Sequence, residues 1–272
     1  MSAFRDFLRR QPRIELAYHT LRKIVSSGGS VAAPTRYGFR MAGSATITSG
    51  EFEAQEIEIV REILPQHDRF IDIGANIGLY SCLARQMGKP VVAVEPLADN
   101  APLLLSNLSV NGWQDTEVIV AGLSDKVGIA EIFGSNTSAS LVSGWSSRSA
   151  HSMIRERIAL TTLDSVLAHR FLNERLLIKV DVEGAEFNLL KGATETLARS
   201  PSPTWVVEIC LSENFPGNRN PRYIETFDFL FDSGYRAMTA NKERRPVRKD
   251  DVMSWYTAGR TPDGVYNYLF SR

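Results

Sequence analysis

Short apolar segments alternate with amphipathic segments along most of this chain. The apolar segments are rich in Val, Ile and Leu, which is typical of strands that are buried on both faces of a sheet. The amphipathic segments carry apolar residues at helical spacing. The expected strands lie at 70–73, 91–94, 118–120, 176–180 and 205–209, and the expected helices at 52–64, 79–87, 99–110, 185–197 and 221–232. This alternation predicts an α/β domain with a doubly wound, largely parallel sheet.

Three segments depart from that alternation. Residues 265–270 alternate between apolar and polar positions and are predicted to form a final edge strand. Residues 134–157 are rich in Ser, Gly and Asn, and residues 240–251 are dense in charge. We expect both to be long loops, which in compact α/β domains are often binding loops or lids.

The N-terminal residues 1–45 are predicted to form a helical appendage on a single domain that spans residues 46–272. Apolar residues between positions 4 and 25 recur at loosely helical spacing among many arginines, and Pro12 divides them into two pieces. We expect the appendage to pack on the core as a cap. The alternatives are that it covers the substrate side, contacts a second subunit in a homo-oligomer, or lies on a membrane surface.

Composition and charge narrow the classes of function. The chain is 43% hydrophobic and 23% charged, which is typical of a globular protein. Lys plus Arg and Asp plus Glu both number 31, and this balance argues against a dedicated nucleic-acid binder. The two cysteines form no metal-binding or disulfide pattern. No apolar run approaches the ~20 residues needed to span a bilayer, so we expect a cytoplasmic protein without a transmembrane segment.

The sharpest chemical signal lies between the first expected strand and its helix, where residues 72–78 read Asp-Ile-Gly-Ala-Asn-Ile-Gly. Glycines permit a tight turn and a close approach to a ligand, and the helix N-terminus offers free N–H groups. A dinucleotide fingerprint reads G-x-G-x-x-G, whereas this loop reads G-x-N-x-G and opens with Asp72. The sulfonium and amino groups of S-adenosylmethionine are both positive, so the acid favours that ligand over a pyrophosphate.

Glu95 ends the second expected strand and is followed by Pro96. In this topology an acid about 20 residues beyond the glycine loop accepts hydrogen bonds from ribose hydroxyls. The loop and Glu95 together therefore predict a cofactor that contains a nucleoside.

A run of acids, Asp-Val-Glu-Gly-Ala-Glu, occupies residues 181–186 directly after the fourth expected strand. Ligands bind at this end of the strands in open α/β sheets. Lys179 shares one face of the strand with Asp181 and is expected to be its partner. Asp181 or Glu183 is predicted to act as a general base toward a hydroxyl. A Mg²⁺ ion held by oxygen ligands, and a structural role of Glu186 at the next helix N-terminus, are the alternatives.

Two further residues are candidates for the site. His151 lies in the Ser-rich loop between Arg148 and Arg155, and is a candidate base or orienting group for an acceptor. Glu208, on the fifth expected strand, faces either the site or a structural partner.

Taken together, these motifs resemble those of the FkbM-like family of S-adenosylmethionine-dependent methyltransferases. The resemblance covers roughly residues 50–235. It rests on residues 70–80, 94–96, Asn107 with Asn111, 122–125, 162–164 and 178–186.

The resemblance implies a seven-strand Rossmann-like methyltransferase sheet with an antiparallel last strand, and S-adenosylmethionine as the cofactor. It places the glycine loop at the methionine part of the cofactor, Glu95 at the ribose, and Ser124 with Asp125 near the adenine. The residues expected to bind the cofactor are Glu53, Asp72, Gly74, Ala75, Asn76, Gly78, Glu95, Pro96, Ser124, Asp125 and Asp181. The catalytic candidates are Lys179, Asp181, Glu183 and His151.

The predicted function is O-methylation of a small-molecule or glycan acceptor, on a hydroxyl of a sugar, glycan or glycoconjugate. A polyketide or other natural product is the alternative acceptor. A nicotinamide-dependent oxidoreductase is disfavoured by the loop spacing and by the absence of an obvious tyrosine–lysine pair for hydride transfer. A non-catalytic Rossmann-like binding module is disfavoured by the intact loop and acidic run.

Overall fold

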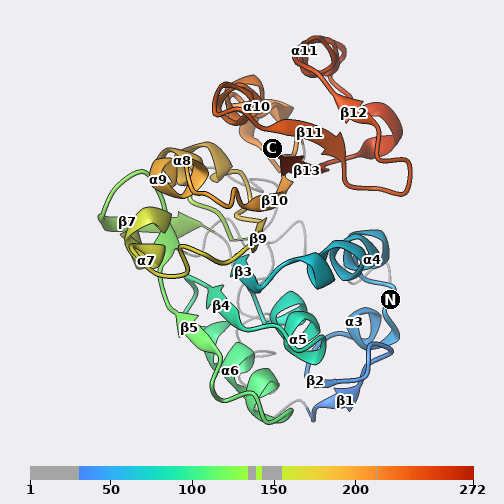
Figure 1. The fold of residues 1–272 in the computed structure, drawn as a ribbon, viewed down its shortest axis with the longest axis vertical. Coiled ribbons are helices and arrows are strands. Elements are labelled where there is room, and N and C mark those ends of the chain that lie inside the picture. The colour runs from blue at the N-terminus through green and yellow to red at the C-terminus, as the bar shows by residue number, and fades with distance from the viewer. Residues whose placement is uncertain (1–30, 134–138, 143–154, 213) are drawn as a thin grey trace, which may run out of the picture.

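A central mixed sheet organises the computed structural model, which describes residues 31–133, 139–142, 155–212 and 214–272. Its strand order in these residues is β12-β11-β13-β10-β9-β3-β4-β5 (Figure 1). The strands are β3 (Arg69–Ile73), β4 (Val91–Val94), β5 (Glu117–Ile119), β9 (Leu176–Val180), β10 (Thr204–Glu208), β11 (Arg236–Thr239), β12 (Pro246–Val247) and β13 (Asn267–Ser271). β10, β9, β3, β4 and β5 are mutually parallel, and β13 runs antiparallel to both β10 and β11. The predicted methyltransferase-type sheet with an antiparallel last strand is confirmed, and β12 extends it by one short strand.

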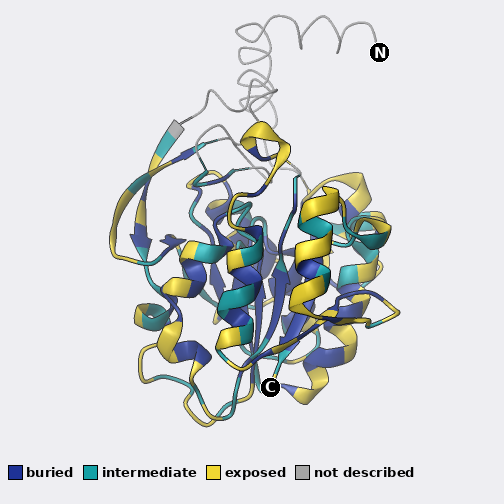
Figure 2. Ribbon diagram, turned by 90° about the horizontal axis from the view of Figure 1, so that it is seen from above, coloured by how far each residue is buried: buried dark blue, intermediate teal, exposed yellow. Residues whose placement is uncertain are grey.

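Helices cover both faces of the sheet because successive strand residues are apolar on both sides. Phe70 packs in one core cluster with α4, α5 and α6, whereas Ile71 and Ile73 pack in the other with α8, α9 and α10. Figure 2 shows the buried strands between helices that are exposed on their outer sides. The helices are α3 (Ala45–Ser49), α4 (Ala54–Ile63), α5 (Leu79–Gln86), α6 (Ala101–Ser109), α7 (Leu163–Leu167), α8 (Glu186–Lys191), α9 (Thr194–Leu197), α10 (Tyr223–Asp232) and α11 (Lys249–Ala258). The doubly wound α/β prediction is confirmed.

The last strand is not an edge strand, so that prediction was wrong. β13 lies between β10 and β11 and pairs with both. Tyr268 and Phe270 are fully buried there. The alternation of polar and apolar residues did not reveal this position, because strand order depends on pairing between residues far apart in sequence.

The helix expected at 185–197 is divided into α8 and α9 at Gly192. A Cβ at Gly192 would lie 2.0 Å from the carbonyl oxygen of Ser124, so the backbone of the neighbouring loop occupies the space of a side chain. The close approach of these two backbones therefore accompanies the break.

The two expected loops are shorter than predicted. Residues 155–157 belong to β8 (Arg155–Thr161), which pairs with β6 (Gly122–Leu123) and β7 (Gly128–Phe133) in a second, three-stranded sheet. Residues 246–251 contain β12 and the start of α11. One of the charged residues of this segment, Asp251, stabilises the start of α11. Its carboxylate accepts a hydrogen bond from the backbone N–H of Arg248 at 2.8 Å, and acids favour a helix N-terminus.

The described part of the predicted appendage packs on the core. β1 (Ala33–Pro34) pairs with β2 (Arg40–Met41), and the side chains of Phe39 and Met41 are buried beside α5 and α6. Asn107 of α6 accepts a hydrogen bond from the backbone N–H of Ala42 at 2.8 Å. Residues 1–30 lie outside the described residues. No helix in the described part of the chain is long and apolar enough to cross a membrane.

Candidate functional site

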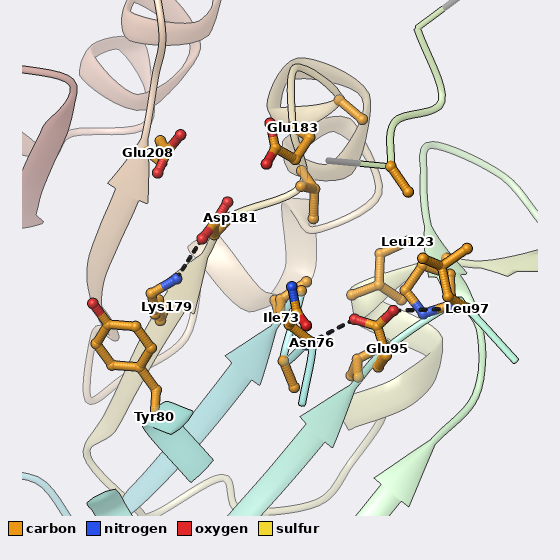
Figure 3. A pocket seen from close by; sticks show the side chains of 18 of the residues that line it. Ile73, Asn76, Tyr80, Glu95, Leu97, Leu123, Lys179, Asp181, Glu183 and Glu208 are labelled. Carbon is orange, nitrogen blue, oxygen red and sulfur yellow. Dashed lines mark hydrogen bonds and ion pairs between the residues drawn. The ribbon is translucent and has the colours of Figure 1, made fainter. Parts of the chain in front are cut away.

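A cavity of about 470 Å³ opens at the carboxyl ends of the central strands. One half is apolar and is lined by Leu97, Leu123, Ile132 and Ile158. The other half is polar and is lined by Glu53, Tyr80, Lys179, Asp181, Glu183, Glu208 and Tyr266. Figure 3 shows Leu97 and Leu123 on one side of Asn76 and Glu95, and Asp181 and Glu208 on the other. A cavity at this edge of an open α/β sheet is the expected ligand site.

The glycine loop leaves β3 directly beneath the end of β9. Gly74 has a φ of +78°, and a Cβ at this position would lie 1.7 Å from the carbonyl oxygen of Asp181. Only glycine fits this crossing of two backbones. The same crossing brings Gly74, Ala75 and Asn76 to the cavity wall.

Asn76 offers an unused acceptor at the cavity. Its φ of +49° lies in the left-handed region, which Asn tolerates better than most residues. Its side-chain oxygen is buried and has no hydrogen-bond partner among the described residues. Buried polar atoms are nearly always paired, so this orphaned oxygen fits a ligand that donates a hydrogen bond.

Glu95 reaches the cavity from the end of β4 with its carboxylate already oriented. It accepts hydrogen bonds from the backbone N–H groups of Asn76 at 2.8 Å and Leu97 at 3.0 Å, and from the side chain of Asn100 at 3.0 Å. Burial raises the pKa of Glu95, and these hydrogen bonds oppose the shift. A carboxylate offers about four acceptor positions, so capacity remains for a ligand hydroxyl. Pro96 lines the same wall.

We expect Glu95→Gln to weaken the binding of S-adenosylhomocysteine by roughly 10- to 100-fold. A carboxamide has one acceptor oxygen, so one of the backbone donors loses its partner, at a cost of about 1–3 kcal/mol. Calorimetric titration measures the affinity. The matched control is Asp125→Asn, a charge-removing change outside the cavity, and an equal loss of affinity in that variant would contradict the assignment.

Asp72 lies behind the cavity wall rather than on it. Its carboxylate is buried and accepts a hydrogen bond from the Ser81 hydroxyl at 2.5 Å. In the β3–β9 pairing, Asp72 lies directly opposite Lys179. Burial raises the pKa of Asp72, and the charge of Lys179 opposes the shift. Gly78, the N-cap of α5, is also absent from the wall, and a Cβ there would meet Leu104 at 2.5 Å.

Lys179 is the only cationic side chain among the described residues of the wall. Its ammonium lies 2.9 Å from Asp181 Oδ2 and 4.4 Å from the centroid of the Tyr80 ring. Burial opposes its charge, but the carboxylates of Asp181, Glu53 and Asp72 outweigh burial and raise the pKa of Lys179. The predicted Lys179–Asp181 pair is confirmed.

Glu183 and Glu208 complete the polar half. Burial and the charges of Asp181 and Glu186 raise the pKa of Glu183 to about 8. Figure 3 marks no hydrogen bond or ion pair from the residues drawn to its carboxyl group. Burial and the charges of Asp181 and Glu183 raise the pKa of Glu208 well above its ordinary value, and the Cys210 thiol donates to Glu208 at 3.2 Å. Of the two alternatives for Glu208, the structure places it on the cavity wall.

Other predicted residues are not brought into the cavity. Ser124 is buried next to β8, where its backbone N–H donates to the carbonyl of Thr161, and Asp125 pairs with Lys191 at 3.3 Å. The wall near them is instead formed by residues 121–123. His151 lies outside the described residues. Within the described residues, no group of three or more His, Cys, Asp or Glu side chains is suited to hold a metal.

Sequence reasoning did not assign a role to Tyr80, Tyr266 or the apolar wall from β7 and β8. Tyr80 lies inside the quoted motif at 70–80, which was the available signal. Ile132 and Ile158 carry no local signal, because their place in the cavity depends on how the second sheet docks.

The chain is similar to a known protein family and to several solved structures. The family model described as "Methyltransferase FkbM domain" matches residues 72–237. Similar solved structures include precorrin-6y C5,15-methyltransferase from Geobacter metallireducens, at 13% identity and a TM-score of 0.43, covering 89% of this chain and 95% of that chain. A SAM-dependent O-methyltransferase from Thermotoga maritima has 15% identity and a TM-score of 0.41, covering 92% of this chain and 80% of that chain. No curated protein matches the sequence.

Proposed function

Because the chain belongs to the FkbM methyltransferase family and is therefore an S-adenosylmethionine-dependent methyltransferase, we propose that it methylates a hydroxyl oxygen of a sugar, glycan or glycoconjugate. Membership of this family excludes the two alternatives raised by the sequence, a nicotinamide-dependent oxidoreductase and a non-catalytic binding module. The polar half of the cavity supports the choice of a sugar hydroxyl as the acceptor.

The residues present fit the cofactor. Gly74, Ala75 and Asn76 form a cradle that a side chain at Gly74 would fill, and Asn76 presents an orphaned acceptor. Glu95 is placed to accept from ribose hydroxyls, and Leu97 with Leu123 offers an apolar surface for a purine ring. S-Adenosylmethionine supplies a methyl group that is activated by its attachment to a sulfonium.

The choice of a sugar as the acceptor rests on the carboxyl groups that line the polar half of the cavity. Glu53, Asp181, Glu183 and Glu208 lie together on one part of the wall, with Lys179 as their cation. Carboxylates accept hydrogen bonds from hydroxyls, and a sugar presents several hydroxyls at once. Tyr266 adds an aromatic face on the same wall.

Glu183 is the general base in this proposal. Asp181 is engaged by the Lys179 ammonium at 2.9 Å, whereas Glu183 has a pKa of about 8 and is therefore the stronger base. Glu183 takes the proton of the acceptor hydroxyl as the hydroxyl oxygen bonds to the methyl carbon. The methyl–sulfur bond breaks at the same time, and S-adenosylhomocysteine leaves. Otherwise the site mainly holds the reacting atoms in line.

Transfer of a labelled methyl group from S-adenosylmethionine to a panel of acceptors tests the proposal. The panel holds neutral glycosides and oligosaccharides, a hydroxylated polyketide, and an amine without a hydroxyl. We expect labelled products from sugars alone, with an O-methyl group located by mass spectrometry and NMR. Methylation of only the polyketide, or of the amine nitrogen, would overturn the choice of acceptor.

A further inference from the structure

Tyr80 contacts two charged side chains of the cavity at the same time. Its hydroxyl donates a hydrogen bond to Glu53 Oε2 at 2.7 Å. The centroid of its ring lies 4.4 Å from the ammonium of Lys179, which is a cation–π distance. Tyr80 is 6% exposed and belongs to the first turns of α5. One side chain therefore joins α4, α5 and β9 at the polar half of the cavity.

Glu53 is held in an unfavourable backbone conformation. It is the N-cap of α4 and has a φ of +47°, which glutamate rarely adopts. Such conformations persist where the surrounding structure over-determines them, and they cluster at functional sites. Its carboxylate lines the cavity rather than capping the helix that follows.

The charge of Glu53 depends on its neighbours. Burial raises the pKa of Glu53, whereas Lys179 and the Tyr80 hydrogen bond lower it. The titratable groups that act on Glu53 or are acted on by it come from several elements and are Lys179, Asp181, Glu183, Tyr80, Glu56 and Tyr266. The Tyr80 hydroxyl is the direct donor to Glu53 in this set.

We propose that Tyr80 is a positioning residue of this methyltransferase. Its hydroxyl fixes the carboxyl group of Glu53, and its ring holds the Lys179 ammonium against Asp181. The polar half of the cavity therefore keeps one arrangement of charge beside the cofactor loop. The link to methyl transfer rests on the proposed function, whereas the link to the cofactor does not require a known acceptor.

Four variants test this role through the pH dependence of S-adenosylmethionine affinity, measured by calorimetry. Tyr80→Phe removes the hydroxyl and keeps the ring, Glu53→Gln removes the charge, and the double variant combines both. Tyr235→Phe is the matched control, because Tyr235 also donates from a buried hydroxyl, to the carbonyl of Leu197 at 3.0 Å, away from the cavity wall.

The hydroxyl lowers the pKa of Glu53, so its loss raises that pKa. Affinity for the positively charged cofactor falls as Glu53 gains a proton, and in Tyr80→Phe we expect this fall to begin at a higher pH than in the unaltered protein. In the Glu53→Gln background the Tyr80→Phe change should have no further effect on the profile. Tyr235→Phe should lower stability without moving the profile.

Two outcomes would overturn the positioning role: a Tyr80→Phe profile that matches Tyr235→Phe, or a Tyr80→Phe shift that survives unchanged in the Glu53→Gln background. Turnover separates this result from the proposed function. With a sugar that the enzyme methylates as the acceptor, Tyr80→Phe should lower kcat about tenfold with little change in the KM for that sugar. If no sugar is methylated but the affinity profiles behave as expected, the acceptor assignment fails and the positioning role stands.

Discussion

Glu183→Gln should lower methyl transfer by roughly 10²- to 10⁴-fold, the usual contribution of a general base. The glutamine amide has the size of the carboxyl group but is too weak a base to accept the proton of a hydroxyl. Glu183 is not among the residues expected to bind the cofactor, whereas Asn76 and Glu95 belong to that set and line the same cavity. S-Adenosylmethionine affinity should therefore change much less than kcat. Initial rates with labelled cofactor, together with calorimetric titration, measure the two effects separately.

The pH profile gives the same variant a second test. Burial and the neighbouring charges of Asp181 and Glu186 raise the pKa of Glu183 to about 8. A base acts when it is deprotonated, so turnover of the unaltered enzyme should rise with pH and level off above about 8. Glu183→Gln should lose that rise.

Glu208→Gln is the contrasting variant. Burial and the charges of Asp181 and Glu183 raise the pKa of Glu208 well above its ordinary value, which favours its protonated form. Glutamine resembles a protonated carboxyl group, and most of the turnover should remain. If Glu208→Gln lost the activity while Glu183→Gln kept it, the base would be Glu208 and the assignment of Glu183 would be wrong.

Gly74→Ala should destabilise the protein by more than about 4 kcal/mol, or prevent folding, which is an exceptional cost for a single methyl group. The new Cβ would lie 1.7 Å from the carbonyl oxygen of Asp181, so the end of β9 or the loop after β3 must move. Both segments are held by the β3–β9 pairing from Arg69 to Ile73. Chemical denaturation followed by circular dichroism measures the free energy of unfolding.

Gly88→Ala is the matched control for this prediction. Gly88 has a φ of +76°, close to that of Gly74, but no heavy atom lies within 4 Å of the Cβ that alanine would add. Its cost should be limited to the left-handed conformation, about 1–2 kcal/mol. Equal losses in the two variants would show that the crossing with β9 does not constrain Gly74.

The sequence by itself determined the fold class and indicated the cofactor loop. Strands such as 91–94 are apolar at every position, and only a sheet covered on both faces buries such a run. The loop at 72–78 was identifiable because its acid and both glycines lie within seven consecutive residues between a strand and a helix. Glu95 was identifiable from its place at the end of the next strand, and the acidic run at 181–186 from its place after the fourth expected strand.

The tertiary structure alone decided which side chains share the cavity. Glu53, Tyr80 and Glu208 come from three separate elements, and their common wall depends on how α4, α5 and β10 pack. Ser124 directly follows β6, whose residues line the cavity, yet Ser124 lies outside the wall and its backbone bonds to β8. Asp125 also lies outside the wall and pairs with Lys191. The interior position of β13 is of the same kind, because its neighbours β10 and β11 are selected by long-range pairing. Local periodicity records whether a residue is buried, but contacts between distant segments determine which residues it meets.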